Sequence, residues 1–142
     1  MKVVAVYSTS PEGRVALERA TEEAHIRDAE LHIVRVMTGA ASENPSRVRE
    51  RDNETRTARE DMDQLTNQLS TKGISVVGRV LAGDSESPTQ PILEYLSAEG
   101  ADVLVLGLRR RSPVGKLVLG STAQDLLLGA DCPVLAVKAP NR

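Results

Sequence analysis

The sequence predicts an α/β fold: a Rossmann-like, three-layer α/β/α sandwich built on a five-stranded parallel sheet. Three observations support this prediction. Short β-branched runs alternate with helical segments along the whole chain. Two of these runs, residues 103–106 and 133–137, are almost wholly aliphatic, which is typical of parallel strands covered on both faces. A chain of 142 residues is also the size of one domain, which we assign to residues 1–142.

The first half of the chain is expected to begin with a strand at residues 3–7, which a Ser-Thr-Ser-Pro turn ends. Residues 11–27 keep their apolar positions on one helical face, and residues 31–37 have the pattern of a second strand. Residues 46–72 repeat apolar side chains at helical spacing, although the first half of this segment is mostly charged. That charge is typical of a helical face exposed to solvent.

The second half repeats the alternation. A strand is expected at residues 74–81, and Pro91 suits the first turn of a helix that ends at Gly100. The aliphatic strands at 103–106 and 133–137 then flank a last helix. With right-handed crossovers, the simplest strand order is 3-2-1-4-5. In that order a crevice opens at the carboxyl ends of strands 1 and 4, where we expect a ligand.

Composition excludes several classes of function. The 18 basic and 20 acidic residues give a net charge of −2, so no field favours nucleic acid or a membrane surface. Tyr7 and Tyr95 are the only aromatic residues, which leaves no base-stacking platform. Cys132 is the single cysteine, and no apolar N-terminal segment resembles a signal peptide or a membrane span, so we expect a cytoplasmic protein. His25 and His32 lack partners at metal-ligand spacing, and we expect no metal site.

The strand at 103–106 leads into the most informative stretch of the chain. It ends at Gly107, and an arginine-bearing loop, residues 109–111, leads to Gly120 and Ser121 at a helix start. Backbone N–H groups and positive charge in this arrangement can bind a phosphate. A solvated basic loop is the alternative. Ser121 and Gln124 also have the spacing of a capping box with Ser121 as N-cap, which requires no ligand; the two interpretations are compatible.

Several segments together resemble the universal stress protein family. They are V-A-V-Y-S-T-S-P, L-H-I-V-R-V, G-A-D-V-L-V-L-G, the G-S-T helix start and D-C-P-V-L-A-V-K, and the resemblance covers essentially the whole chain. It implies a cytoplasmic homodimer, regulatory in the stress response, that binds ATP or AMP. Nucleotide-binding members share the loop pattern Gly, two residues, Gly, nine residues, Gly, then Ser or Thr. Gly107, Gly120 and Ser121 match it, and Arg110 stands in place of the second glycine.

The resemblance also implies which residues contact the nucleotide. Relatives carry an aspartate after strand 1 that addresses the base or ribose, and Ser8 occupies that position here. Val36 matches a position that contacts adenine through its backbone. Mg²⁺ would be expected only together with ATP. The predicted site consists of Tyr7, Ser8, Thr9, Val36, Gly107, Arg109, Arg110, Gly120, Ser121 and Thr122.

Two hypotheses of different classes remain open. In the first, guanidinium groups of the arginine loop contact phosphate oxygens in place of the missing glycine. In the second, the protein is a dimeric interaction module that binds no nucleotide. Strand 133–138 should lie at a sheet edge, which a second copy could cover or Pro140 could blunt. No nucleophile and base stand out, so at most slow ATP hydrolysis is expected.

Overall fold

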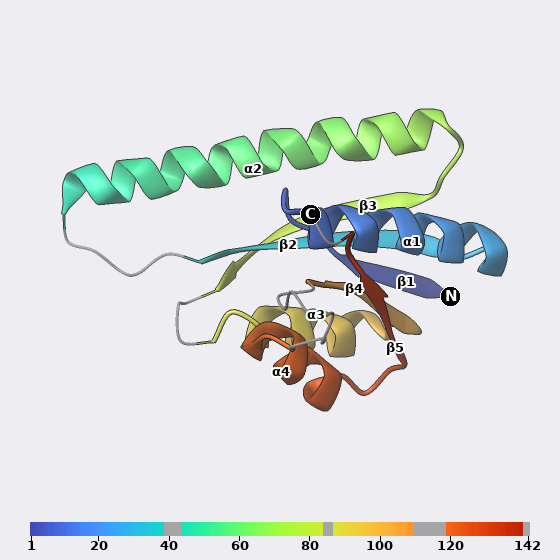
Figure 1. Ribbon diagram of the computed structural model, residues 1–142. Helices are drawn as coiled ribbons and strands as arrows, with labels where there is room; N and C mark the ends of the chain where they lie inside the picture. Colours follow the sequence, from blue (N-terminus) through green and yellow to red (C-terminus); the bar gives the residue numbers. More distant parts are fainter. Residues whose placement is uncertain (39–43, 84–86, 110–118, 141–142) are drawn as a thin grey trace.

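Strands and helices alternate along the computed structural model, which describes residues 1–38, 44–83, 87–109 and 119–140 (Figure 1). The strands form one parallel five-stranded sheet in the predicted order β3-β2-β1-β4-β5. The elements are β1 (Lys2–Val6), α1 (Pro11–Arg27), β2 (Glu30–Thr38), α2 (Pro45–Thr71), β3 (Val76–Gly83), α3 (Gln90–Glu99), β4 (Val103–Leu108), α4 (Ser121–Gly129) and β5 (Val134–Lys138).

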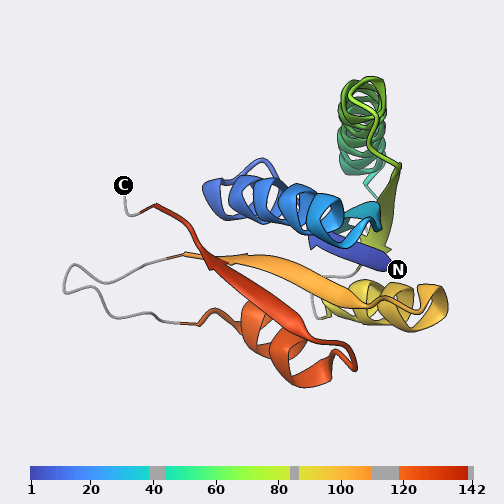
Figure 2. The ribbon, with the colours of Figure 1, turned by 90° about the vertical axis from the view of Figure 1, so that its right-hand side faces the viewer.

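Helices cover both faces of the sheet, with α1 and α2 on one side and α3 and α4 on the other (Figure 2). Because side chains of a strand alternate between faces, β1 sends Val3 and Ala5 to the first side and Val4 to the second. All three are fully buried. Alanines of α1, Ala16 and Ala20 among them, let this helix lie close to the central strands. The core is therefore aliphatic and divided by the sheet into two halves.

The last strand is only partly covered by the rest of the protein. Its place at the edge of the sheet, paired only with β4, is as predicted. The expectation that residues 133–137 are covered on both faces is met only in part, because Val134 packs against the core on the side of α3 and α4 but Ala136 on the same strand is exposed. Leu135 and Val137 pack against the core under α1, whereas Ala136 and Lys138 are exposed. An aliphatic run alone does not distinguish a central strand from an edge strand whose outer face meets solvent.

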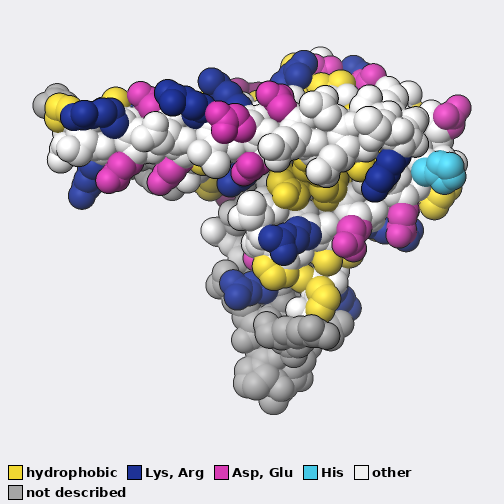
Figure 3. Space-filling view, turned by 90° about the horizontal axis from the view of Figure 1, so that it is seen from above, with side chains coloured by type: hydrophobic (Ala, Val, Ile, Leu, Met, Phe, Trp, Pro, Cys, Tyr) yellow, Lys and Arg dark blue, Asp and Glu magenta, His cyan; other side chains and the backbone are white. Residues whose placement is uncertain are grey.

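Helix α2 is far longer than its contact with the sheet. Its 27 residues extend about 40 Å, and only Ala58 and Met62 are buried. The amino-terminal half projects beyond the sheet (Figure 1), and acidic and basic side chains are interspersed along it (Figure 3). This agrees with the predicted solvated face. Among the helices that the structure describes, none has the length and apolar character needed to cross a membrane.

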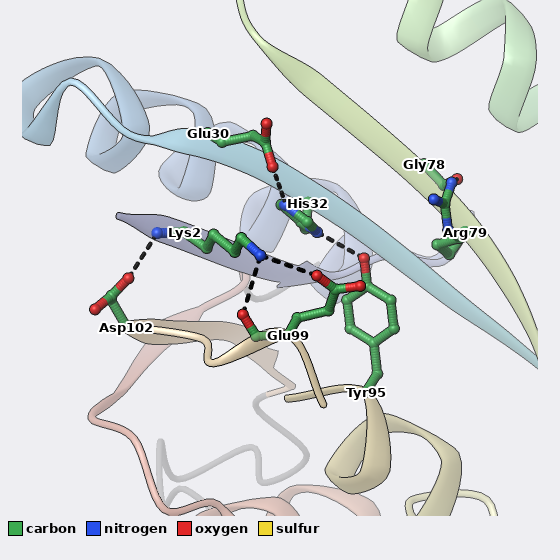
Figure 4. A network of polar contacts seen from close by, with 8 residues as sticks. All are labelled: Lys2, Glu30, His32, Gly78, Arg79, Tyr95, Glu99 and Asp102. Carbon is green, nitrogen blue, oxygen red and sulfur yellow. Dashed lines mark hydrogen bonds and ion pairs between the residues drawn. The ribbon is translucent and has the colours of Figure 1, made fainter. Parts of the chain in front are cut away.

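A polar network joins the strand starts to α3, at the end of the sheet opposite the predicted crevice (Figure 4). His32 is only 3% exposed; its Nε2 lies 2.5 Å from Glu30 Oε1 and its Nδ1 lies 2.6 Å from Tyr95 Oη. Lys2 Nζ donates to a carboxylate oxygen of Glu99 at 2.9 Å, and this hydrogen bond lowers the pKa of Glu99. Burial raises the pKa of the Tyr95 hydroxyl. These contacts give His32 a structural role.

Candidate functional site

A crevice of about 450 Å³ opens where the carboxyl ends of β1, β2 and β4 meet the starts of α1, α3 and α4. This is the point at which the chain connections reverse direction, as the strand order predicted. The crevice is lined by Val6, Tyr7, Ser8, Ser10, Glu12, Gly13, Val36, Thr38, Pro88, Ile92, Leu106, Gly107, Leu108, Arg109, Gly120, Ser121, Thr122 and Ala123.

The turn after β1 is organised by two serines. Ser10 is the N-cap of α1, and its hydroxyl accepts a hydrogen bond from the backbone N–H of Gly13 at 3.3 Å. The hydroxyl of Ser8 lies 2.5 Å from that of Ser10. Pro11 at the first helical position fixes where the helix begins. The turn therefore presents hydroxyls, rather than a carboxylate, at the position where the sequence lacks an aspartate.

Gly107 lies where the backbone of α1 packs directly against β4. A β-carbon at this position would collide with the backbone carbonyl of Glu12, so no other residue fits without a shift of the helix. This requirement is steric, and it does not depend on a ligand. It also brings Glu12 to the carboxyl end of β4, on the wall of the crevice.

The amino terminus of α4 is open toward the crevice. The prediction that Ser121 is an N-cap within a capping box is wrong: the helix begins at Ser121, and Gly120 is the N-cap in extended conformation. A residue at the first helical position cannot cap the turn that it starts, and no side chain caps α4. Among the residues that the structure describes, nothing lies within 4 Å of where a β-carbon of Gly120 would stand. The first turn of α4 thus lines the crevice with N–H groups that no side chain caps, an arrangement that suits an anion.

Most of the predicted site residues come together in this crevice. Thr9 is exposed on the turn and does not line the crevice, and Arg110 lies outside the described residues. Arg109 is exposed at the rim. The predicted residues found on the wall are Tyr7, Ser8, Val36, Gly107, Arg109, Gly120, Ser121 and Thr122.

Sequence reasoning missed other lining residues. Glu12, in the first turn after β1, could have been anticipated, because every helix that follows a strand here starts at the same edge of the sheet. Pro88 and Ile92 reach the crevice from the start of α3 for the same reason. Glu12 matters most among them, because it is an acidic residue that lines the same crevice as Gly120 and Ser121.

Comparison with known proteins identifies the family. The model of the universal stress protein family matches residues 1–138. The chain belongs to this family. A universal stress protein of Mycolicibacterium smegmatis is 36% identical over 136 residues, which cover 96% of each chain.

Solved structures of universal stress proteins share the fold. One from Archaeoglobus fulgidus is 28% identical, with a TM-score of 0.71 over 96% of this chain and 97% of its own. One from Lactobacillus plantarum is 19% identical, with a TM-score of 0.78 over the same shares. Other family structures were solved with AMP (Arabidopsis thaliana), dAMP (Archaeoglobus fulgidus) and cAMP bound, at 19%, 23% and 19% identity and TM-scores of 0.70, 0.65 and 0.70. They cover 99%, 96% and 99% of this chain, and 92%, 96% and 98% of theirs.

This universal stress protein also carries potentially reactive side chains outside the crevice, Cys132 and His25 among them. Within the described ranges, no three His, Cys, Asp or Glu side chains gather where they could hold a metal ion. Burial raises the pKa of the Cys132 thiol, which disfavours the reactive thiolate. His25 is exposed on the last turn of α1. The crevice is therefore the region on which we base function.

Proposed function

We propose that this protein binds an adenine nucleotide, ATP or AMP, in the crevice at the carboxyl ends of β1 and β4, and acts as a cytoplasmic regulator in the stress response. The observation that carries the proposal is the uncapped amino terminus of α4, which faces the crevice across Gly120. Relatives of the same fold solved with AMP, dAMP and cAMP support the choice of ligand.

The crevice offers each part of a nucleotide a suitable surface. N–H groups at Ser121 and Thr122, together with the guanidinium of Arg109, suit phosphate oxygens. Ile92 and Val36 offer apolar surface to a base, and the backbone of Val36 can hydrogen bond to its edge. This division of the crevice is part of the proposal.

Isothermal titration of nucleotide-stripped protein with ATP, AMP and GTP tests it. We expect saturable binding of an adenine nucleotide in preference to GTP. Arg109→Ala should weaken binding by about tenfold, the scale of one hydrogen bond to a charged group. Arg14→Ala removes an exposed arginine of α1 that lies outside the crevice, and serves as the matched control. Absence of saturable binding by either adenine nucleotide would refute the proposal and favour the interaction module.

We also propose that two copies pair through β5. The strand hydrogen bonds to β4 on one side only, and no described element covers its other edge. Antiparallel pairing of two such edges about a two-fold axis would satisfy the open backbone groups of both copies. The measurement is molecular mass by light scattering over a range of protein concentrations, with a dimer expected.

A further inference from the structure

Glu12 is an unusual residue to find in an anion-binding crevice. It is the second residue of α1, half-buried, and it lines the crevice. Among the described residues, its Oε2 is the one buried side-chain nitrogen or oxygen without a hydrogen-bond partner. A buried carboxylate oxygen without a partner is unfavourable, and native proteins rarely retain one without a reason.

The local backbone holds Glu12 in this place. Ser10 caps the same first turn of the helix, and the carbonyl of Glu12 is packed against the α-carbon of Gly107. Its backbone cannot move without disturbing the contact between α1 and β4. The backbone of Glu12 thus stays at the wall of the crevice whether or not a ligand is present.

A carboxylate in this position opposes the binding of a bare phosphate. Glu12 shares the crevice with Gly120 and Ser121, where the proposed anion site lies, and like charges in one partly desolvated space repel. No ion pair joins Glu12 to a basic side chain in the part of the chain that the structure describes. A ligand that brought its own positive charge would remove the repulsion and give Oε2 a partner.

A divalent cation carried by a polyphosphate meets this requirement. Mg²⁺ is commonly bound through one or two carboxylates together with phosphate oxygens and water, rather than by a cage of protein ligands alone. The described residues contain no group of three ligands that could hold a cation unaided. Glu12 with phosphate oxygens would form a site that exists only when the nucleotide is present.

Resting on the proposed function, we propose that Glu12 is a carboxylate ligand to a divalent cation that enters with ATP, so that the crevice selects Mg²⁺-ATP over free ATP. Glu12 would then determine which form of ATP, with or without Mg²⁺, the crevice binds. Its negative charge lowers the affinity for free ATP, and its contact with the cation raises the affinity for Mg²⁺-ATP.

Titration calorimetry with ATP in Mg²⁺ and in EDTA tests the inference. We expect the wild type to bind Mg²⁺-ATP at least about tenfold tighter than free ATP, and Glu12→Gln to reduce this ratio to about twofold. The Gln variant should bind free ATP better and Mg²⁺-ATP worse. Glu18→Gln, an exposed change on the same helix, should keep the wild-type ratio.

Each contrary result has a separate meaning. If the wild type binds neither form of ATP, the proposed function itself fails. If it binds both forms equally, or if Glu12→Gln keeps the wild-type ratio, nucleotide binding stands and the role of Glu12 is refuted. Glu12→Gln and Glu12→Asp should both fold, as circular dichroism would check; Asp keeps the charge but is shorter, so its ratio should fall between the other two. If Glu12→Gln does not fold, Glu12→Ala takes its place, and a folded Ala variant that keeps the wild-type ratio refutes the role of Glu12.

Discussion

The carbonyl of Glu12 lies so close to the α-carbon of Gly107 that the two residues leave no space for a β-carbon between α1 and β4. Gly107→Ala should therefore force the start of α1 away from the sheet. We expect a loss of about 1–3 kcal/mol in the free energy of unfolding, the usual scale for overpacking a core contact. Urea denaturation measures it, and an unchanged midpoint would contradict the close approach.

Gly120→Ala is the matched comparison, because none of the described residues lies within 4 Å of the new methyl group. Alanine is a poorer N-cap than glycine, but it also restricts the unfolded chain, and these two effects of a few tenths to about 1 kcal/mol oppose each other. Stability should stay within about 0.5 kcal/mol of the wild type. Binding of AMP should weaken, because the methyl group occupies the crevice. Calorimetry that showed undiminished affinity would argue against this end of the crevice as the phosphate site.

A proline at Ala136 should separate dimerisation from folding. Ala139 N donates to Leu108 O at 2.8 Å and Pro133 O accepts from Leu104 N at 2.9 Å, so odd-numbered residues of β5 face β4. Ala136 therefore directs its N–H to the open edge, where proline is tolerated.

We expect Ala136→Pro to remain folded and become monomeric, as light scattering would show. Val137→Pro is the control, because it removes a hydrogen bond of the β4–β5 ladder and should destabilise the protein. A dimeric Ala136→Pro variant would rule out pairing through this edge.

Glu23 should make stability depend on pH. It is 7% exposed and accepts from Arg19 at 2.7 Å and from Arg27 at 3.0 Å. The hydrogen bond from Arg27, aided by the charge of Arg19, lowers the pKa of Glu23 in the folded protein. Its contribution is therefore complete above the ordinary glutamate pKa of about 4.3 and is lost as pH falls through the lowered value.

Glu23→Gln should accordingly be less stable than the wild type at pH 7, with a difference that closes in acid. Thermal unfolding from pH 7 down to about pH 3 spans the relevant range. The exposed Glu18 provides the control substitution, Glu18→Gln, for which no comparable trend is expected. A difference that stayed constant with pH would show that packing, rather than charge, accounts for the role of Glu23.

Tyr95→Phe should lower the stability of the protein through the buried side chain of His32. It removes the hydroxyl 2.6 Å from Nδ1 and leaves that nitrogen buried without a partner. The expected loss is about 1–3 kcal/mol in the free energy of unfolding. Tyr7→Phe removes a hydroxyl outside this network and should change stability little. Equal effects of the two substitutions in urea denaturation would contradict the network.

The sequence predicted the elements whose boundaries depend on local chemistry. Helix α1 begins at Pro11 and ends at Arg27 as expected, because Ser10 caps it and Asp28 adopts a left-handed conformation after its last turn. The sheet order also followed from the alternation of elements. Local pattern and connection rules are sufficient for such features.

Features that depend on distant contacts could not be predicted in the same way. Glu12 enters the crevice because it packs on Gly107, which lies far away in the sequence. Ser121 had the spacing of a cap, yet the helix began one residue earlier than that cap requires. The predicted contact of Arg110 falls outside the described residues, so it stays a prediction.

The central position of β1 has a consequence for the order of assembly. This first strand pairs with β2 on one side and with β4 on the other, so one of its edges stays open until the last third of the chain is synthesised. Ser10 and Glu12 are synthesised early, but Gly107 and Gly120, which also line the crevice, are synthesised late. A ligand that requires both walls binds only chains that have completed this docking, and it stabilises them by mass action. In the cell, such a ligand would thus stabilise fully folded chains and have no effect on chains that are still being synthesised.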